Sequence, residues 1–242
     1  YNDFFIHSIY FLYKMKIDKV FVINLEHRTD RRTQIQNELA RIGIDNFEIF
    51  SAIKPTTEML QAWNPKFLDP IPQWFLSRDG DQTKYRIGSL GCMMSHLKIM
   101  ELCIERNYEN VLILEDDTLF QDKHTNGRQW EDLWNPVANE LELLPTYGLV
   151  YLAGNHRGSQ CVKVSNHLIK VNGTLTTGSY IISKDMMKYI IEHIYHYPRE
   201  IDVFYATVIQ SIFNCYCVVP HWTKQGEGYS DIVQEYVSYK LG

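Results

Sequence analysis

The chain has 242 residues, of which 45% are hydrophobic and 22% are charged, with a formal net charge of −5. This length suits a single large domain with a sizeable core. The slightly acidic balance argues against nucleic acid as a partner, because phosphate backbones are bound by clustered Lys and Arg. The five cysteines contain no CxxC pair. We therefore expect mostly buried thiols in a reducing compartment, and neither a dense disulfide framework nor a zinc knuckle.

Residues 1–15 form an aromatic stretch that is interrupted by Asn2, Asp3 and His7. This stretch lacks a basic leader and is too short to span a bilayer. We treat it as an N-terminal extension of unknown role, before a single domain over 16–242. We expect no signal peptide, no firm membrane segment and a cytoplasmic location. Self-association into a homodimer stays open, as does whether the chain is part of a longer polypeptide.

The first regular elements predict a βαβ unit. The β-branched run at 19–25 predicts a buried strand, and apolar residues at helical spacing over 31–43 predict the helix that follows. Asp30 can cap that helix and Gly43 can end it. The next strand is predicted at 47–52. Strand, helix and strand at this spacing indicate parallel pairing.

The rest of the chain continues the alternation of strands and helices. Residues 54–86 contain four prolines and predict an irregular functional loop or lid. A helix is predicted at 89–106 and a strand at 110–117. Further strands are predicted at 148–154, 161–165, 167–171, 178–183 and 215–220, and helices at 184–194 and 202–213. The pattern indicates one α/β domain.

The strand at 110–117 ends in three carboxylates, Glu115, Asp116 and Asp117. Residues two apart share a face of a strand, so Glu115 and Asp117 are expected together. At about 6 Å and an effective dielectric of about 20, they repel by about 3 kcal/mol. A hard cation such as Mg²⁺ or Mn²⁺ offsets this repulsion, and open α/β sheets bind ligands at the carboxyl ends of their strands. The alternative is that one aspartate caps the next turn and the others are solvated.

Other catalytic motifs are missing from the sequence. It contains no G-x-x-x-x-G-K-[ST], so the acidic strand is not that of a P-loop NTPase. It also contains no G-x-S-x-G and no H-E-x-x-H. A literal D-x-D at Asp79-Gly80-Asp81 follows no predicted strand, and we interpret it as a loop.

Six segments, in this order, resemble glycosyltransferase family 25. They are VFVINLEHRTDRR (20–32), GSLGCMMSHLKIM (88–100), VLILEDDTLF (111–120), TTGSYIISKDMMKYI (176–190), REIDVF (199–204) and QGEGYSDI (225–232). The family includes enzymes of bacterial lipooligosaccharide assembly, collagen-modifying enzymes and proteins of giant viruses. The resemblance implies a GT-A type fold, a Rossmann-like α/β nucleotide-sugar-binding domain with a mixed central sheet.

The resemblance also implies a reaction. It is an inverting, metal-dependent transfer of a hexose or N-acetylhexosamine from a UDP-sugar to a hydroxyl of a glycan or a collagen-like protein. One departure stands out, because Ala52-Ile53-Lys54-Pro55 replaces the Ala-x-Asp-Gly pattern that is common in the family. A non-catalytic relative that keeps the fold and binds a nucleotide sugar is therefore an alternative. A metal-dependent phosphohydrolase is a third hypothesis.

The resemblance implies roles for the carboxylates. Asp117 is the expected ligand of Mn²⁺ or Mg²⁺, with Glu115 as its partner and His221 completing the metal shell. Asp116 is expected to hold the ribose or an interior hydrogen bond. For proton removal from the acceptor hydroxyl, Asp202 is the expected base, with Glu227 and Asp231 as alternatives; Asp202 can instead cap a helix. His96 is a further expected catalytic residue.

Donor binding is expected at the strand ends and glycine turns. Arg28, Arg31 and Arg32 follow the first strand, and Arg28 and Arg32 lie four residues apart on one helix face, where their planar forks suit phosphate or base stacking; a surface salt bridge is the alternative. Gly88 and Gly91 are expected at a helix start, where backbone N–H groups face an anion. The expected donor-binding residues are Asn24, Leu25, Arg28, Arg32, Ala52, Gly88, Gly91, Ser95, Asp116, Thr177, Gly178 and Gln225. Thr177, Gly178 and Tyr180 are expected to border the sugar or acceptor, and Trp63 and Trp74 either stack on a sugar or pack in the core.

Overall fold

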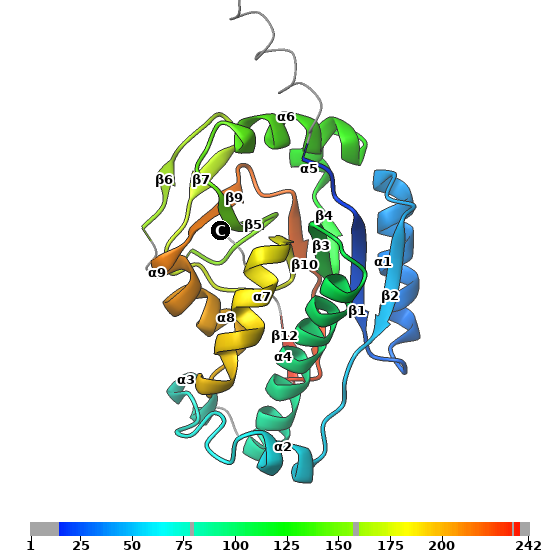
Figure 1. Cartoon of the computed structure of the whole chain (residues 1–242). Helices are drawn as coiled ribbons and strands as arrows, with labels where there is room; N and C mark the ends of the chain where they lie inside the picture. Colours follow the sequence, from blue (N-terminus) through cyan, green and yellow to red (C-terminus); the bar gives the residue numbers. More distant parts are fainter. Residues whose placement is uncertain (1–14, 78–79, 157–159, 234, 238–242) are drawn as a thin grey trace, which may run out of the picture.

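An eight-stranded mixed sheet organises the chain (Figure 1). The computed structural model describes residues 15–77, 80–156, 160–233 and 235–237, so the extension expected over 1–15 lies outside it except for Met15. The strands of the large sheet are β1 (Lys19–Asn24), β2 (Phe47–Ser51), β3 (Asn110–Glu115), β5 (Tyr147–Tyr151), β6 (Val162–Lys163), β7 (Leu168–Lys170), β8 (Ser179–Ser183) and β9 (Asn214–Val218). Two small sheets pair β4 (Thr118–Phe120) with β10 (Thr223–Gln225) and β11 (Gly228–Ser230) with β12 (Glu235–Val237).

The helices alternate with the strands along most of the chain. They are α1 (Thr29–Ile42), α2 (Thr57–Trp63), α3 (Gln73–Leu76), α4 (Gln82–Glu105), α5 (Asp122–Thr125), α6 (Trp130–Glu142), α7 (Lys184–His193), α8 (Ile201–Phe204) and α9 (Gln210–Ile212). A 3₁₀ turn, η2 (Ile194–His196), follows α7, and a π-helical turn, η3 (Tyr205–Ile209), joins α8 to α9.

The strand order of the large sheet is β2-β1-β3-β8-β5-β9-β7-β6. β1 pairs in parallel with both β2 and β3, which confirms the predicted βαβ unit and forms a Rossmann-like half. β8 pairs antiparallel with β3 and β5, while β5 and β9 are parallel. This arrangement confirms the expected α/β class with a mixed central sheet. The parallel pairing brings the carboxyl ends of β1, β2 and β3 to one edge.

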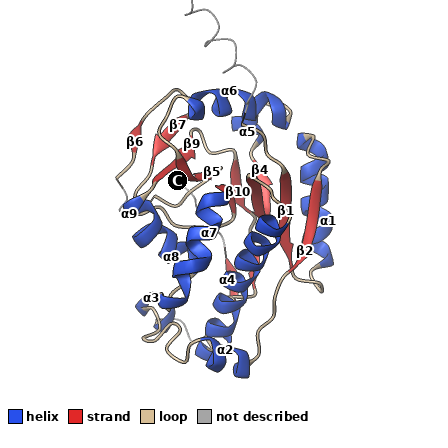
Figure 2. Ribbon diagram, viewed as in Figure 1, coloured by secondary structure: helices blue, strands red, loops and turns tan. Residues whose placement is uncertain are grey.

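Helices cover both faces of the sheet, as Figure 2 shows. Alternate residues of β3 explain the two layers, because successive side chains of a strand point to opposite faces. Val111 and Ile113 join the core against α4 and α7. Leu112 and Leu114 join the core against α1 and α6. Glu115 continues the register of Ile113, so it ends the strand on the α4 side.

Several elements differ from the sequence prediction. The proline-rich stretch at 54–86 is not irregular throughout, since it contains α2, α3 and the first turn of α4. α4 begins at Gln82 because the Asp81 carboxylate accepts hydrogen bonds from the backbone N–H groups of Thr83 and Lys84. Asp81 is therefore a helix cap, which fits its interpretation as a loop residue. α6 was not predicted, and it contains Pro136 in its interior.

One helix passes a length and composition test for a membrane span. Within the described residues this is α4, whose most apolar window is 56% buried inside the protein. A mostly buried core helix passes the same test, and α4 packs against α7 and β1.

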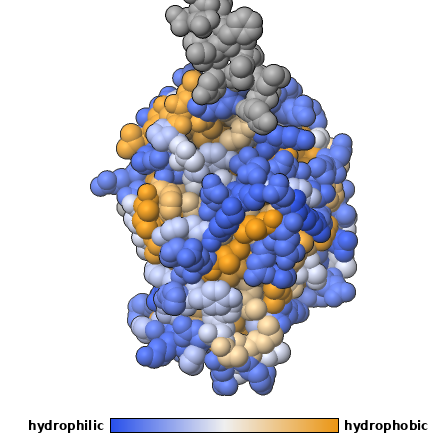
Figure 3. Space-filling view, in the orientation of Figure 1, coloured by the Kyte–Doolittle hydropathy of each residue, from blue (hydrophilic) through white to orange (hydrophobic). Residues whose placement is uncertain are grey.

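The visible face in Figure 3 is largely hydrophilic, with apolar side chains gathered in small separate patches.

Candidate active site

A cavity of about 870 Å³ opens where the parallel strands end. Its walls come from the loops after β1, β2 and β3, from α4, from the start of α8 and from the segment around β10 and β11. The expected site residues that line it are Leu25, Ala52, Gly88, Gly91, Ser95, His96, Glu115, Asp116, Asp117, Thr177, Asp202 and Gln225. Those that do not line it are Asn24, Arg28, Arg32, Gly178, His221 and Glu227.

Glu115 is held from the α4 side of the sheet. The hydroxyl of Thr177 donates a hydrogen bond of 2.8 Å to its Oε1. Nε2 of the fully buried His96 lies 3.5 Å from the same oxygen, while Nδ1 of His96 lies 2.8 Å from the hydroxyl of Tyr180. Burial raises the pKa of Glu115, but the nearby His96 imidazole and the Thr177 hydroxyl more than offset this and lower it. His96 therefore lines the cavity and also positions Glu115, whereas the buried Tyr180 does not line the cavity.

Asp116 turns toward α1, away from Glu115. Its Oδ2 accepts a hydrogen bond of 2.7 Å from Nδ2 of Asn24, and its Oδ1 accepts one of 3.1 Å from Arg31. The interior hydrogen bond expected of Asp116 is confirmed. Asn24 itself does not reach the cavity and acts through this bond. Burial raises the pKa of Asp116 despite these donors.

Asp117 lies in the turn after β3, so the expected pairing of Glu115 and Asp117 along one strand is wrong. Its Oδ2 lies 3.3 Å from Arg31. Its Oδ1 is buried and has no hydrogen-bond partner among the described residues. Burial and the charge of Glu115 raise the pKa of Asp117 to about 7. A buried carboxylate oxygen without a donor is costly, and a divalent cation would satisfy it.

The three arginines after β1 have different roles. Arg31 lines the cavity, where it contacts Asp116 and Asp117 and donates a hydrogen bond of 2.9 Å to the backbone oxygen of Tyr229. Arg28 forms ion pairs with Asp30 and Asp231, which tie the C-terminal segment to α1.

Arg32 is exposed on the outside of α1, so its expected role at the donor is wrong. Of the three arginines, Arg31 is the one that lines the cavity. Among the arginines of this turn, Arg31 is the one that the expected donor-binding residues did not include.

The expected ligand set of Asp117, Glu115 and His221 is not assembled. Among the described residues, two groups bring three ligating atoms within 4.8 Å of one another: Cys92, His96 and Glu115, and His156, Cys217 and His221. Asp117 belongs to neither group. His221 follows β9 and lies beside His156, with burial and the charges of His156 and His124 lowering its pKa to about 4. The prediction that it shares a metal with Asp117 is wrong.

Gly88 and Gly91 do not form the anion-binding helix start that was expected. Both lie inside α4, where backbone N–H groups are used by the helix. A Cβ on Gly91 would lie 2.6 Å from the backbone oxygen of Ile53, so glycine lets the loop after β2 pack against the helix. The hydroxyl of Ser95 accepts a hydrogen bond of 2.8 Å from Ile53 N–H. These residues shape the cavity wall.

Asp202 lines the cavity from the first turn of α8. Burial and the charge of Glu200 raise its pKa to about 6, which suits a group that accepts a proton near neutral pH. Of the alternatives, Glu227 is exposed and outside the cavity, and Asp231 is engaged by Arg28 and His27. Asp202 is the best placed of the three to act as a base.

Two further positions were expected from aromatic and glycine residues. Trp74 lines the cavity and is 49% exposed, whereas Trp63 stacks on Tyr195 at 4.4 Å and does not line it. The backbone oxygen of Gly178 accepts hydrogen bonds from Glu115 N–H and the Thr118 hydroxyl. Gly178 therefore holds the backbone around the acidic turn without lining the cavity. Lys54 and Lys84 also line the cavity, and sequence reasoning missed both.

Comparison with known proteins identifies the family. The family model described as "Glycosyltransferase family 25 (LPS biosynthesis protein)" matches residues 17–205.

The chain belongs to glycosyltransferase family 25.

Its relatives include procollagen galactosyltransferase 1-B of Xenopus laevis, 36% identical over 115 residues, which are 45% of this chain and 17% of the relative. A glycosyltransferase 25 family member of Drosophila melanogaster is 25% identical over 175 residues, 70% of this chain and 27% of the relative. Procollagen galactosyltransferase 2 of Mus musculus is 32% identical over 114 residues, 45% and 17% of the two chains. The chain thus spans only a minor part of these relatives.

Two solved structures resemble the chain at low identity. Mannose-1-phosphate geranyltransferase from Thermus thermophilus aligns with a TM-score of 0.44 and 10% identity, covering 90% of this chain and 77% of that one. A glycosyltransferase involved in the glycosylation of the major capsid of PBCV-1 aligns with a TM-score of 0.37 and 12% identity, covering 74% and 64%.

The family 25 match contains most of the cavity. It includes α4, the acidic turn at Asp117 and the Asp202 carboxylate, and it ends before the segment at 225–232. That segment still reaches the cavity through Gln225 and Asp231.

Proposed function

We propose that this family 25 chain is an inverting, metal-dependent glycosyltransferase domain that uses a UDP-sugar donor. It moves a hexose or N-acetylhexosamine to a hydroxyl of a glycan or of a collagen-like protein. The observation that carries the proposal is the buried Oδ1 of Asp117, unpartnered among the described residues, in a cavity at the carboxyl ends of parallel strands. Such strand ends are where nucleotides bind in open α/β sheets.

The donor set around Asp117 fits a hard divalent cation. Asp117 would hold Mn²⁺ or Mg²⁺ together with donor phosphate oxygens, and Glu115 adds negative charge nearby. When bound, the cation supplies charge that stabilises the departing diphosphate. Arg31 adds a fixed positive charge beside the same carboxylates. The cavity volume of about 870 Å³ is in the range of sites for small organic ligands.

Asp202 would take the proton from the acceptor hydroxyl. Its raised pKa, about 6, leaves it ionised at neutral pH and still basic enough to accept a proton. The reaction would be a direct displacement at the sugar carbon, in which the hydroxyl oxygen bonds to that carbon as the bond to the diphosphate breaks. The exposed ring of Trp74 offers an apolar face on which a sugar can stack.

The acceptor class is proposed from the relatives. Those named procollagen galactosyltransferase point to a hydroxyl on a collagen-like chain, and the family description points to a lipopolysaccharide glycan. The net charge of −5 fits a partner other than nucleic acid.

A donor screen tests the proposal. Thermal unfolding is followed with UDP-hexoses and UDP-N-acetylhexosamines, each with and without Mn²⁺, because a ligand that binds only the folded state raises the Tm. The donor that raises the Tm with metal is then given a lipopolysaccharide-derived oligosaccharide or a hydroxylysine-containing collagen peptide. Metal-dependent release of UDP with sugar on one acceptor is the expected result. If no UDP-sugar raises the Tm in the presence of Mn²⁺, the proposal is wrong.

A non-catalytic relative is the second candidate. The cavity lining by Lys54 and Pro55, where the family pattern has Asp-Gly, favours it. A metal-dependent rise in Tm without transfer to any acceptor would support this candidate. Release of inorganic phosphate without sugar transfer would instead indicate a phosphohydrolase.

A further inference from the structure

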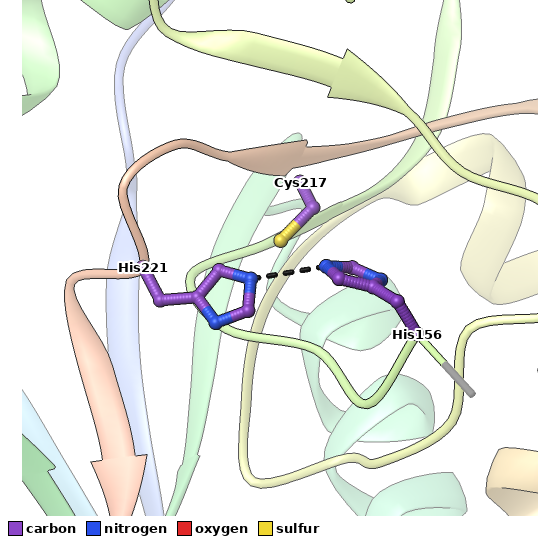
Figure 4. A group of neighbouring side chains, drawn as sticks. All are labelled: His156, Cys217 and His221. Carbon is purple, nitrogen blue, oxygen red and sulfur yellow. Dashed lines mark hydrogen bonds between the residues drawn. The ribbon is translucent and has the colours of Figure 1, made fainter. Parts of the chain in front are cut away.

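Three side chains meet outside the cavity, at the turn that follows β9. His156 comes from the loop after β5, Cys217 from β9 and His221 from the β9–β10 connection (Figure 4). Figure 4 shows the Cys217 thiol pointing toward both imidazole rings. Their ligating atoms all lie within 4.8 Å of one another. None of these three residues lines the large cavity, so the group is separate from the candidate active site.

The distances within this group fit a small tetrahedral ion. Nε2 of His156 and Nε2 of His221 lie 3.0 Å apart. Zinc binds nitrogen at about 2.0–2.1 Å and thiolate sulfur at about 2.3 Å, which sets two nitrogen ligands roughly 3.3 Å apart. Only a small movement of the rings would therefore seat an ion between them and the Cys217 sulfur.

The surroundings orient the ring of His156. Its Nδ1 lies 2.8 Å from the hydroxyl of the buried Thr174, and donation of Nδ1–H to that hydroxyl would leave the Nε2 lone pair facing His221. A Cβ on Gly154 would lie 2.9 Å from the His156 ring and 2.6 Å from Thr174, so glycine makes room for this packing. Such outer hydrogen bonds are typical of metal-binding histidines.

The backbone of His221 is also held in place. Its carbonyl oxygen accepts hydrogen bonds from Nδ1 of His124, at 2.6 Å, and from Nε2 of Gln121, at 3.2 Å. Cys217 is buried on a central strand and is not in a disulfide. All three groups are thus carried on fixed backbone from two different strands and their connections.

We propose that His156, Cys217 and His221 form a zinc site with three protein ligands, in which water takes the fourth tetrahedral position. One thiolate and two imidazoles are soft and borderline ligands that suit Zn²⁺ rather than Mg²⁺ or Mn²⁺. A metal here would join the end of β5 to the β9–β10 connection. Asn155 and Gln225, which border these segments, line the large cavity, so the ion would also brace one of its walls. The proposal does not depend on the proposed transferase function.

The sequence alone does not reveal this site, because its ligands are brought together by folding. His156 and Cys217 come from segments that meet only through the pairing of β5 with β9. Cys217 and His221 are four residues apart, and a single thiol and a single imidazole at that spacing carry little signal.

Metal content is the direct test. The protein is prepared without a histidine tag, dialysed against a weak chelator and analysed for metals by mass spectrometry. We expect about one zinc ion per chain in the wild type, and loss of nearly all of it in Cys217→Ser and His221→Gln. Cys215→Ser is the matched control, because Cys215 is also buried on β9 but lies outside the group, and it should keep its zinc.

A second measurement uses the wild-type protein, so it tests the proposal even where a variant fails to fold. Co²⁺ is titrated into metal-free wild-type protein, and the thiolate-to-cobalt charge-transfer band and the visible bands of tetrahedral Co²⁺ are recorded. Both should appear at about one equivalent, and Zn²⁺ should displace them and raise the Tm. Absence of thiolate-linked Co²⁺ bands, or equal zinc content in the wild type and Cys217→Ser, would overturn the proposal. His156→Gln, at a half-buried position, should weaken zinc binding while the protein stays folded.

Discussion

The guanidinium of Arg31 contacts one carboxylate oxygen of Asp117, at 3.3 Å, while the other oxygen is buried without a partner among the described residues. The charge of Asp117 is thus only half satisfied by these residues. A ligand that brings a cation would satisfy the second oxygen of Asp117.

Asp117→Asn should abolish metal-dependent donor binding. The amide keeps the shape of the side chain but removes the charge that a divalent cation requires. We expect turnover to fall by about 100-fold or more, with the far-ultraviolet circular dichroism unchanged. Isothermal titration calorimetry of UDP binding to the protein in the presence of Mn²⁺ measures the effect. Asp132→Asn, on the exposed face of α6, is the control. Normal Mn²⁺-dependent binding by Asp117→Asn would exclude Asp117 as a ligand.

Stability should fall as the pH rises through the range in which Asp117 and Asp202 ionise. Their folded pKa values, about 7 and about 6, lie above the ordinary value of 3.8, so the folded state holds these protons more tightly than the unfolded state. The two groups together contribute on the order of a few kcal/mol to the free energy of unfolding. This contribution is complete below about pH 4 and is lost by about pH 7. Urea unfolding across this range measures it. Asp117→Asn should flatten the slope, and an unchanged slope would contradict the assignment.

Asp202→Asn should lower kcat without weakening donor binding. A general base contributes roughly 10²- to 10⁴-fold, and its loss leaves the acidic turn and Arg31 intact. The wild-type kcat/KM should rise with pH through about 6, the pKa of Asp202, and this limb should disappear in the variant. Glu227→Gln is the control, because Glu227 is exposed and outside the cavity. A larger loss in Glu227→Gln than in Asp202→Asn would reverse the assignment.

Arg31→Gln should weaken UDP binding in the presence of Mn²⁺ by about 10- to 100-fold, since hydrogen bonds to charged groups contribute about 1.5–3 kcal/mol. Arg31→Lys should restore little, because an ammonium cannot reproduce the planar fork that spans two carboxylates and a backbone oxygen. Arg32→Gln on the outer face of α1 is the matched control. Equal effects of the two glutamine variants would mean that Arg31 acts only through net charge.

Gly91→Ala should destabilise the protein although alanine favours helices. The propensity gain in α4 is about 1 kcal/mol. The new Cβ would stand 2.6 Å from the Ile53 oxygen and 2.9 Å from Pro55 Cδ, and such overpacking costs about 1–3 kcal/mol. Chemical unfolding should show a net loss, with Lys98→Ala at an exposed position of the same helix near neutral. A stabilised Gly91→Ala would show that the loop yields easily.

The strands and the order of elements follow from local periodicity, which is why β1, α1, β2, β3, β8 and α7 were predicted close to their bounds. Where the prediction fails, distant residues decide. The start of α4 is an exception, because it depends on the adjacent Asp81 cap, in a stretch that was interpreted as a loop; Gly88 and Gly91 were therefore placed at a helix start instead of inside the helix. The rotation of α1 about its axis depends on the packing of its apolar face, so the sequence could not distinguish Arg31 from Arg32.

His221 shows the same limit at longer range. A late histidine suits a metal in many proteins, but its partner is set by how β9 and the loop after β5 meet. The acidic turn was recognisable because apolar and charged residues are adjacent in the chain. The sequence did not show that Glu115 lies on the α4 side and Asp116 on the α1 side, since this depends on where the strand ends.

One guanidinium joins two distant parts of the chain. Arg31 binds the backbone oxygen of Tyr229, 198 residues away, as well as the turn after β3. During translation, nearly the whole described chain therefore has to be synthesised before the contact between Arg31 and Tyr229 can form at the cavity. During synthesis the acidic turn stands without its final cover, and nascent chains that stop short of Tyr229 should be unable to hold a donor even where the large sheet has formed.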